Sequence, residues 1–457
     1  MIYSYFESRG GLYDHTVFFG LQYFLHRYLA GVVVSQQKID EAAELCVAHL
    51  GSADLFNRAG WEHILKVHGG RLPIVIRAVP EGTLVPTKNV LFTMENTDPA
   101  CFWLTNYLET LLVQVWYPMT VATNSRSMKE VIAGYLEETG CGLEGLAFKL
   151  HDFGYRGVSS VESAATGGAA HLVNFMGTDT MAGYVMARQY YDEPMSGFSI
   201  PAAEHSTMTS WTKAREADAY RNMLTAFPTG LVAVVSDSYD IFHACENIWG
   251  KELKELIMER DGTLVVRPDS GDPPVIVVQV LESLGKAFGT TDTPKGFKML
   301  PPQIRVIQGD GISAQSLPVI LEAMKVAGWA ADNLAFGSGG ALLQKMNRDT
   351  QKCAFKCSFA VIDGSPVDVY KDPITDPGKK SKKGRLTLQR AADGTLSTVC
   401  DGAGDPETDV LVEVFRDGAV TKDWTFAEVR AAAQIPAVKA AEAKAAAAAA
   451  GGAAAAE

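Results

Sequence analysis

A repeated alternation of short apolar runs and helical segments constrains the fold of this chain more than any other feature. Seven apolar runs lie between residues 147 and 350, and each ends in polar or glycine residues: Phe148–Gly154, His171–Asp179, Gly197–His205, Leu231–Ser238, Leu264–Gly271, Ile304–Gly311 and Leu334–Gly340. Segments with helical apolar spacing lie between them: Thr212–Phe227, Asp240–Arg260, Val275–Phe288 and Ala314–Gly328. A repeat of strand, polar tip and helix is typical of parallel β/α units.

Two α/β architectures could use these units. In a closed or nearly closed parallel barrel, the carboxyl ends of all strands lie on one face, and that face carries the active site. An open doubly wound sheet is the alternative, but it usually shows one dominant glycine fingerprint, which this sequence lacks. We therefore predict a β/α barrel-like catalytic domain over residues 147–350.

The segments on either side of the repeat have a different character. Residues 1–146 combine helices with strand-like runs, and residues 351–436 return to β patterning. These two parts predict a second, flanking domain, mostly antiparallel and built from both chain ends. The helical stretch Pro99–Glu138 is expected to break at Pro118. Residues 437–457 are mostly alanine and predict a helix-prone tail with no core to join.

Composition and charge narrow the class of protein. Apolar residues make up 47% of the chain and charged residues 21%, which allows a large core and excludes global disorder. The formal net charge of −12 argues against nucleic acid or an anionic membrane as the main partner. No signal peptide precedes the first strand, and polar residues interrupt the most apolar stretch. We expect a cytoplasmic protein.

The cysteines predict reduced thiols. The chain has seven scattered cysteines, an odd number without a compact disulfide framework. Cys353 and Cys357 have a CxxxC spacing, but no second pair or histidine cluster in the sequence completes a zinc site around them. We expect them to be strand cysteines, and no metal ligands are assigned.

Glycines and carboxylates follow the last strands of the repeat. The backbone amides of Gly337–Gly340 and Gly309–Gly311 could bind a phosphate, or the glycines could serve tight turns that need positive φ. Asp269 and Asp310 end neighbouring runs. Paired carboxylates beside a phosphate site suit ribose hydroxyls or Mg²⁺, whereas either one alone could instead cap the next helix.

Three further side chains at strand ends could act on a substrate. Phe153 could stack on a planar ring or make an ordinary core contact. Asp179 would accept hydrogen bonds from an amide and repel a carboxylate. His205 is a possible acid, base or phosphate acceptor, although a lone histidine more often has a structural role.

Basic residues cluster after the repeat: Arg348, Lys356, Lys371, Lys379, Lys380, Lys382, Lys383 and Arg385. Such a run could be a solvated loop or a nucleic-acid patch. In an acidic chain, a basic loop that follows glycine loops is better interpreted as a lid over a polyphosphate.

Many strings in order resemble the nicotinamide phosphoribosyltransferase family: Tyr3-Ser-Tyr-Phe-Glu7, Gly20-Leu-Gln-Tyr23, His151-Asp-Phe-Gly-Tyr-Arg-Gly-Val-Ser-Ser160, Pro201-Ala-Ala-Glu-His-Ser206, Val235-Ser-Asp-Ser-Tyr-Asp240, Arg267-Pro-Asp-Ser-Gly271, Val306-Ile-Gln-Gly-Asp-Gly311, Ala335-Phe-Gly-Ser-Gly-Gly340 and Ser381-Lys-Lys-Gly-Arg385. The likeness runs from residue 3 to about 435. It implies a pentosyltransferase of NAD salvage, which makes nicotinamide mononucleotide and pyrophosphate from nicotinamide and phosphoribosyl pyrophosphate (PRPP). It also implies Mg²⁺, stimulation by ATP, and a homodimer with the active site at the subunit interface.

The resemblance assigns roles residue by residue. Around nicotinamide it places Phe153 as the stacking ring and Asp179 as the amide partner, with Arg156, Arg267 and Ser199 nearby. Around the ribose and its phosphate it places Asp269, Gly309, Asp310, Gly340, Arg348 and Lys356. His205 resembles the histidine that ATP phosphorylates, and with Asp269 and Asp310 it forms the expected catalytic set. The expected polyphosphate ligands are Arg9, Lys371, Lys379 and Arg385.

Two alternatives to this function are considered, and the first follows from a departure from the family. Relatives carry a segment ahead of the position of Tyr3 whose tyrosine covers the other face of the nicotinamide ring, so we expect weaker ring binding here. A barrel that lost activity with that segment could survive as a binding protein, although intact glycine loops argue against this. Nicotinate phosphoribosyltransferase is the other alternative. Asp179 argues against it, because a carboxylate substrate would face a carboxylate.

Overall fold

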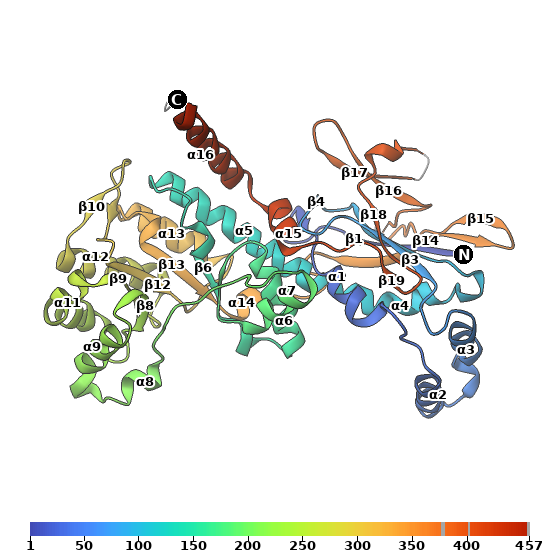
Figure 1. Ribbon diagram of the computed structural model, residues 1–457, viewed down its shortest axis with the longest axis horizontal. Helices are drawn as coiled ribbons and strands as arrows, with labels where there is room; N and C mark the ends of the chain where they lie inside the picture. Colours follow the sequence, from blue (N-terminus) through green and yellow to red (C-terminus); the bar gives the residue numbers. More distant parts are fainter. Residues whose placement is uncertain (376–379, 401–402, 455–457) are drawn as a thin grey trace. The chain divides into compact units, whose positions relative to one another are not determined.

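The computed structural model describes residues 1–375, 380–400 and 403–454 (Figure 1). The chain divides into two compact units. The first, here called the sheet unit, comprises Met1–Thr123, Ala187–Glu193 and Met346–Ala433. The second, here called the barrel unit, comprises Asn124–Met186, Pro194–Lys345 and Gln434–Glu457. The predicted α/β fold class is confirmed, with parallel strands in one unit and antiparallel strands from both chain ends in the other.

The barrel unit contains a six-stranded parallel sheet in the order β7-β6-β13-β12-β9-β8. Its strands are β6 (Leu150–Asp152), β7 (Gly177–Thr178), β8 (Thr229–Val235), β9 (Asp261–Arg267), β12 (Ile304–Gln308) and β13 (Leu334–Ser338). Parallel bridges join Gly177 to Phe198 and Ala202 to Ala233, so residues 198–202 connect the two edge strands. The ring is therefore nearly closed, as predicted, and the open doubly wound sheet is excluded.

Two of the seven predicted strand runs differ from the structure. In the run that begins at His171, the first two residues end helix α6 (Val161–Leu172), and only Gly177 and Thr178 pair as a strand. The run that begins at Gly197 forms no regular strand and makes only the two bridges. Pro201 contributes to this, because it has no N–H to donate to a ladder, although its carbonyl still accepts from Ala233 at 2.9 Å.

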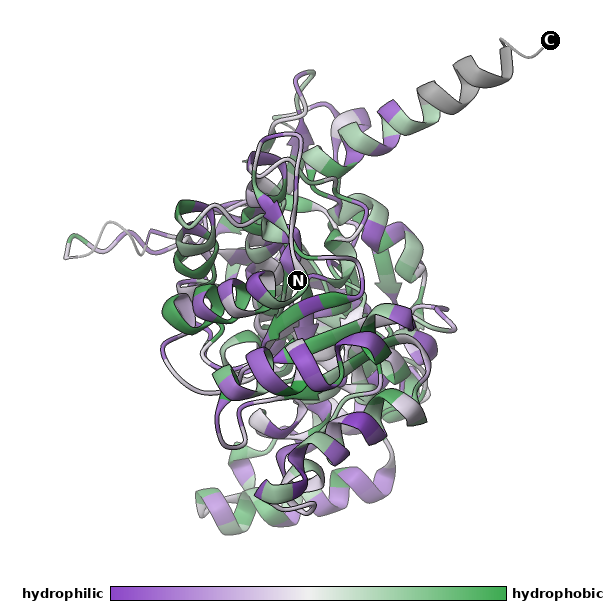
Figure 2. Cartoon of the chain, turned by 90° about the vertical axis from the view of Figure 1, so that its left-hand side faces the viewer, coloured by the Kyte–Doolittle hydropathy of each residue, from purple (hydrophilic) through white to green (hydrophobic). Residues whose placement is uncertain are grey.

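Helices follow the strands as predicted. They are α7 (Met181–Tyr190), α8 (His205–Thr209), α9 (Glu216–Ala226), α10 (Ile241–His243), α11 (Lys254–Glu259), α12 (Pro273–Phe288), α13 (Ser316–Val326) and α14 (Gly340–Leu343). A hairpin of β10 (Thr291–Asp292) and β11 (Lys298–Met299) follows α12. Figure 2 shows helices in which hydrophilic and hydrophobic residues alternate along the ribbon. Apolar residues on strands and inner helix faces are removed from water, which stabilises the unit.

The interior of the barrel ends in a small apolar layer. Ala233, Val265 and Ile307 come from β8, β9 and β12 and are at most 6% exposed. Phe153 and Ile200 pack against this layer from the strand ends. This layer fills the interior of the barrel below its carboxyl-terminal face, so groups on that face lie above packed side chains and not above an open channel.

The sheet unit is built on a seven-stranded sheet in the order β15-β14-β1-β5-β3-β18-β19. Its strands are β1 (Ile2–Ser8), β3 (Ile74–Ala78), β5 (Val90–Asn96), β14 (Cys353–Ile362), β15 (Ser365–Asp368), β18 (Val412–Arg416) and β19 (Ala419–Val420), and all pairs are antiparallel. Two separate antiparallel pairs belong to the same unit: β2 (His15–Val17) with β4 (Leu84–Pro86), which are distant in sequence, and the hairpin of β16 (Leu386–Arg390) with β17 (Leu396–Cys400). Because β1 pairs with β14, the amino-terminal strand is held by the carboxyl-terminal part of the chain.

Helices of the remaining chain are α1 (Leu21–Phe24), α2 (Gln36–Leu50), α3 (Arg58–Val67), α4 (Leu104–Leu112), α5 (Trp116–Glu138), α15 (Phe426–Ala433) and α16 (Pro436–Ala454). The predicted break at Pro118 is wrong. The irregularity is a 3-10 turn at Val113–Val115, and Pro118 lies in the first turn of α5, where a missing N–H costs nothing. The alanine-rich tail forms α16, whose described side chains from residue 439 to 446 are exposed.

The described residues contain no candidate membrane-spanning helix and no disulfide. No helix there is both long and apolar enough to cross a membrane. All seven cysteines are described, and each is a free thiol, as predicted. Cys353 is buried on β14, and burial raises its pKa to about 12, whereas Cys357 on the same strand is half-buried.

Candidate active site

A cavity of about 390 Å³ opens in the barrel unit at the carboxyl ends of the strands. Its lining combines glycines, two arginines, a lysine and an aromatic ring: Phe153, Arg156, Gly157, Arg267, Gly309, Asp310, Gly311, Ile312, Ser313, Gly339, Gly340, Ala341 and Lys345. Six of the residues selected from the sequence therefore meet here, namely Phe153, Arg156, Arg267, Gly309, Asp310 and Gly340. Cationic side chains and glycine-rich loops next to a helix start suit an anionic ligand.

Phe153 presents a half-buried aromatic ring to this cavity. Its N–H donates to the carbonyl of Ser338 at 2.9 Å, which fixes the residue just after β6. The ring lies so close to β13 that a Cβ at Gly337 would fall 1.9 Å from Cε2 of Phe153. The guanidinium carbon of Arg267 lies 5.4 Å from the ring centroid, within range of a cation–π contact. The ring of Phe153 thus packs against the apolar layer of the barrel and also lines the cavity.

At most positions of the two glycine loops, glycine leaves room for neighbouring groups or a ligand, and the backbone does not have positive φ. Gly337, Gly339, Gly340 and Gly309 all lack positive φ, so the tight-turn alternative is wrong for them. Gly311 has a φ of +71°, so that alternative holds at this one position. A Cβ at Gly309 would lie 3.0 Å from Nε of Arg267. Nothing lies within 4 Å of the Cβ position at Gly340, which faces the cavity. The absence of side chains therefore leaves room for Phe153, for Arg267 and for a ligand.

Asp269 and Asp310 do not cap the helices that follow them. The residue before α12 is Asp272, and the residue before α13 is Gln315. Asp269 instead accepts hydrogen bonds from Nε and Nη2 of Arg267, at 3.0 and 2.8 Å. Asp310 is exposed at the cavity. The helix-capping alternative is therefore wrong for both, and both residues lie just beyond the carboxyl ends of their strands, β9 and β12.

His205 is the first residue of α8 and lies between two carboxylates. Its Nε2 is 2.9 Å from Oδ1 of Asp237, and its Nδ1 is 4.0 Å from Oδ2 of Asp269. The other oxygen of Asp237 accepts from the hydroxyl of Ser270 at 2.6 Å. Sequence reasoning assigned Asp237 no role. Its position after β8 matches those of Asp269 and Asp310 after their strands, and this shared position was the available signal.

Asp179 and Ser199 form a pair outside the lining of the cavity. The Ser199 hydroxyl donates to Oδ1 of Asp179, and the Asp179 N–H donates to the carbonyl of Asp152 at 2.9 Å. A carboxylate is thus positioned at the end of β7, one residue beyond the strand.

Two titratable side chains on the neighbouring strand β6 are buried. Burial raises the pKa of the Asp152 carboxyl to about 7, and the Gly154 N–H that donates to it opposes this shift. Burial also lowers the pKa of His151.

The remaining predicted ligands lie in the sheet unit. Arg348 donates to the carbonyl of Cys353 at 2.9 Å, and Nζ of Lys356 is 3.7 Å from Glu109. Arg385 pairs with Glu95 and lies 5.3 Å from the ring centroid of Tyr3. These contacts give Arg385 a structural role that the sequence did not indicate.

A second cavity, of about 580 Å³, lies in the sheet unit. It is lined by Glu7, Arg9, Lys88, Tyr370, Asp372, Lys380, Ser381, Lys382 and Lys383. Of the predicted polyphosphate ligands, Arg9 lines this cavity, whereas Lys371 and Arg385 do not. Lys371 instead hydrogen-bonds through its backbone to Ser381 at 3.0 Å. Lys379 lies outside the described residues. The predicted basic loop therefore contributes to a cationic pocket.

Family comparisons cover most of the chain. The model of the nicotinate phosphoribosyltransferase family matches residues 148–418. The model described as the amino-terminal domain of nicotinamide phosphoribosyltransferase matches residues 1–76. Together the two matches include the parallel strands, the glycine loops and the first strand of the antiparallel sheet.

Individual relatives extend this result. The chain is 56% identical to a nicotinamide phosphoribosyltransferase of Xanthomonas campestris pv. campestris over 94% of this chain and 92% of the relative. It is 32% identical to one of Acinetobacter baylyi over 91% and 88%. Among solved structures, the nicotinate-nucleotide pyrophosphorylase of Pyrococcus furiosus is similar with a TM-score of 0.53 at 14% identity, covering 94% of this chain and 88% of that one. Human nicotinic acid phosphoribosyltransferase gives 0.52 at 16%, covering 95% and 88%. These two structures share the fold.

Proposed function

Because this chain belongs to the nicotinate phosphoribosyltransferase family, we propose that it is a nicotinamide phosphoribosyltransferase of NAD salvage. The enzyme joins nicotinamide to PRPP and releases nicotinamide mononucleotide and pyrophosphate. The observation that carries the proposal is the 56% identity, over nearly the whole of both chains, to a protein of that name. The cationic cavity with its aromatic ring supports it, because the two substrates are an aromatic amide and a polyanion.

The nicotinamide ring stacks on Phe153, with Arg267 and Arg156 beside it. A stacked aromatic pair contributes about 0.5–1.5 kcal/mol beyond area burial. The carboxylate of Asp179, held by Ser199, accepts from the amide nitrogen of the substrate. Nicotinate would bring a second carboxylate to the same place, and the repulsion would disfavour it.

The reaction is a displacement at the anomeric carbon of the ribose. The ring nitrogen of nicotinamide supplies an electron pair for the new C–N bond, and the C–O bond to pyrophosphate breaks with its electrons leaving on oxygen. The carbon becomes positively charged in the transition state, and the carboxylates of Asp269 and Asp310 bind the ribose hydroxyls next to it. Gly309, Gly340 and Lys345 bind the ribose phosphate through amides and charge. No protein nucleophile is required.

The donors at this face fit Mg²⁺. Asp269 and Asp310 offer carboxylate oxygens, the ligand type that Mg²⁺ prefers together with substrate phosphates. When bound, Mg²⁺ neutralises charge on the pyrophosphate as it leaves. Arg267 holds Asp269 in place through its two hydrogen bonds, so the carboxylate is oriented before any ligand arrives.

ATP stimulation is assigned to His205. With Nε2–H donating to Asp237, Nδ1 keeps its lone pair and faces the strand ends. Attack of Nδ1 on the γ-phosphorus of ATP forms a P–N bond and expels ADP, and water later releases the phosphate. Asp237 is a positioning residue in this step, because it fixes the ring and its tautomer.

The sheet unit supplies polyphosphate ligands. Arg9 and the lysines of its cavity bind phosphates. Arg348, Lys356 and Lys371 lie outside the lining of this cavity but in the same unit, and they add positive charge. We further propose a homodimer with the active site at the subunit interface. Sedimentation tests the dimer. Mixing two inactive variants, Asp310→Asn and Arg9→Ala, tests the shared site, since recovery of activity requires that one site take residues from two chains.

A single assay tests the activity itself. Pyrophosphate release from PRPP is measured with nicotinamide, with nicotinate and with neither, in the presence and absence of ATP. The proposal predicts turnover with nicotinamide, little with nicotinate, and an increase with ATP. Turnover with nicotinate alone would contradict the assigned substrate, and no release with either base would contradict the assigned reaction.

A further inference from the structure

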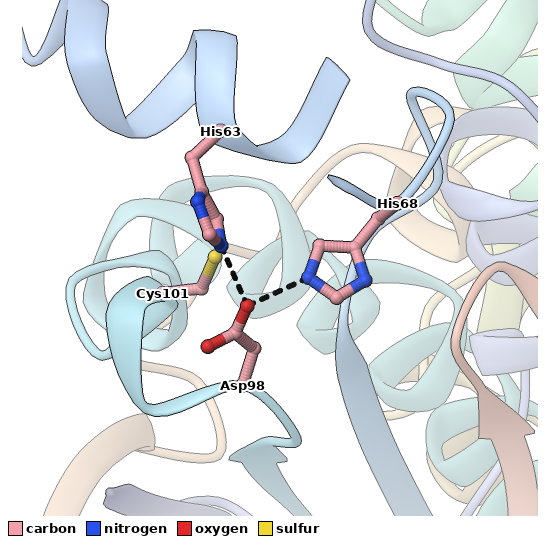
Figure 3. Close-up of side chains that lie close together, drawn as sticks. All are labelled: His63, His68, Asp98 and Cys101. Carbon is pink, nitrogen blue, oxygen red and sulfur yellow. Dashed lines mark hydrogen bonds and ion pairs between the residues drawn. The ribbon is translucent and has the colours of Figure 1, made fainter. Parts of the chain in front are cut away.

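Four metal-ligating side chains meet in the sheet unit, and none of them belongs to the proposed active site. They are His63, His68, Asp98 and Cys101, and one ligand atom of each lies within 4.8 Å of the others (Figure 3). His63 is on α3, and His68 ends that helix. Asp98 precedes the 3-10 turn Pro99–Cys101, of which Cys101 is the last residue. Two short segments, 30 residues apart, thus each contribute two donors.

The geometry of the cluster is already convergent. Nε2 of His63 and Nε2 of His68 each lie 2.7 Å from Oδ2 of Asp98, as the dashed lines in Figure 3 show. The ligand atoms of a tetrahedral zinc site, with bonds of about 2.0–2.3 Å, are separated by roughly 3.3–3.8 Å. The two histidine–aspartate distances therefore need to open by only about 0.6–1 Å, within the reach of side-chain rotation.

The backbone holds Asp98 in position for this arrangement. Its Oδ1 accepts from the N–H of Ala100 at 2.8 Å, which turns Oδ2 toward the histidines. Its carbonyl accepts from the side chain of Asn96 at 2.7 Å and from the N–H of Cys101 at 2.9 Å. Hydrogen bonds of this kind orient a ligating carboxylate before a metal binds.

The four donor types favour Zn²⁺ over Mg²⁺ and Ca²⁺. Two imidazoles, a thiolate and a carboxylate are ligands of Zn²⁺, whereas a thiolate disfavours Mg²⁺ and Ca²⁺. We propose that His63, His68, Asp98 and Cys101 bind one Zn²⁺ ion in a closed, four-coordinate structural site. It ties the end of α3 to the turn after β5. With four protein ligands no position is left for a substrate, so the site supports the fold and takes no part in the reaction.

Proton balance is simple at this site. In the metal-free cluster Nε2 of each histidine carries the proton that it donates to Oδ2 of Asp98. When the metal binds, each imidazole releases this proton to solvent and takes one up on Nδ1, so that Nε2 donates its lone pair and the ring stays neutral. The Cys101 thiol is fully buried. It releases one proton to solvent when the metal binds, because a coordinated thiol is deprotonated. The histidine side chains are 34% and 26% exposed, which leaves the ion a path in.

Metal titration of the full-length protein tests the proposal. The chain is stripped with a chelator, dialysed, and titrated with ZnCl₂ by calorimetry, and Co²⁺ is used as a spectroscopic probe. We expect one tightly bound Zn²⁺ per chain, a higher Tm with Zn²⁺, and a thiolate-to-cobalt charge-transfer band. His63→Gln and His68→Asn should each weaken Zn²⁺ binding by at least about a hundredfold.

Matched variants separate the site from nonspecific binding. Cys46→Ser and His49→Gln change the same residue types on α2 of the same unit and should leave affinity and spectrum unchanged. Cys101→Ser should remove the charge-transfer band. If Cys101→Ser does not fold, the two histidine variants still test the zinc site. Their side chains are partly exposed, so we expect these variants to fold. Absence of stoichiometric binding, or equal affinity in the histidine variants, would show a metal-free hydrogen-bonded cluster and overturn the proposal.

Discussion

Nε2 of His205 lies 2.9 Å from Oδ1 of Asp237, at the carboxyl end of the strand that follows it in the chain. The carboxylate is nearly buried and is itself held by Ser270, so the imidazole is oriented by a fixed partner. The arrangement leaves Nδ1 as the nitrogen available to a phosphoryl group. It also gives Asp237 a positioning role in the proposed ATP step, in which His205 is the group that reacts.

Asp237→Asn should reduce ATP hydrolysis by roughly a hundredfold, the scale of an orienting acid–base group. An amide can donate to Nε2 and so favours the wrong tautomer. Synthesis with saturating PRPP and no ATP should change little. Measurement of both rates in one preparation checks this, and parallel loss of both would mean that Asp237 supports the fold instead.

His205→Ala should abolish ATP hydrolysis and ATP stimulation but keep some PRPP-dependent synthesis. The reason is that phosphohistidine formation is a step separate from displacement at the ribose. Pyrophosphate release with and without ATP is the measurement. If the variant remains fully coupled to ATP, His205 has no part in the mechanism.

Asp179→Asn should loosen discrimination against nicotinate, because the negative charge that repels a carboxylate is removed. We expect the ratio of kcat/KM for amide over acid to fall by about tenfold or more, equivalent to about 1.4 kcal/mol. Asp363→Asn, in an exposed turn, is the charge-matched control. An unchanged ratio in Asp179→Asn would mean that another group sets specificity.

Gly337→Ala should displace the ring of Phe153, since the new Cβ would fall 1.9 Å from Cε2. Loss of stacking predicts a KM for nicotinamide up to about tenfold higher, with a smaller effect on PRPP. Gly134→Ala in α5 meets no atom within 4 Å and controls for a glycine replacement in the same unit. Equal KM increases for both substrates would indicate damage to the whole barrel.

Asp152→Asn should flatten the pH dependence of stability. The pKa of the folded carboxyl is raised to about 7, whereas it is about 4 in the unfolded chain. The stabilisation is complete below about pH 4 and is lost as pH rises toward 7, because the unfolded state ionises first, with an upper limit of about 4 kcal/mol. Urea unfolding of both proteins across this window measures the difference. Identical slopes would mean that Asp152 is ionised in the fold.

The alternation of apolar runs with helices was sufficient to predict parallel β/α units, because period and strand length are local properties of the sequence. It also predicted that Asp269, Asp310 and the glycine loops would share one face, since the carboxyl ends of parallel strands lie together. For the sheet unit, the sequence predicted a domain built from both chain ends. It did not predict that β1 pairs with β14, or the register of that pair.

Tertiary structure alone decided how distant segments meet. Residues 198–202 connect the edges of the barrel through two bridges, although Pro201 makes the segment a poor strand by sequence. The partnership of His205 with Asp237, and the space at Gly337 that admits Phe153, depend on the packing of neighbouring units. The His63, His68, Asp98 and Cys101 cluster has the same origin, because antiparallel pairing of β3 with β5 brings a helix end to a turn 30 residues later. Such contacts are set by the closure of the whole fold, which no local pattern encodes.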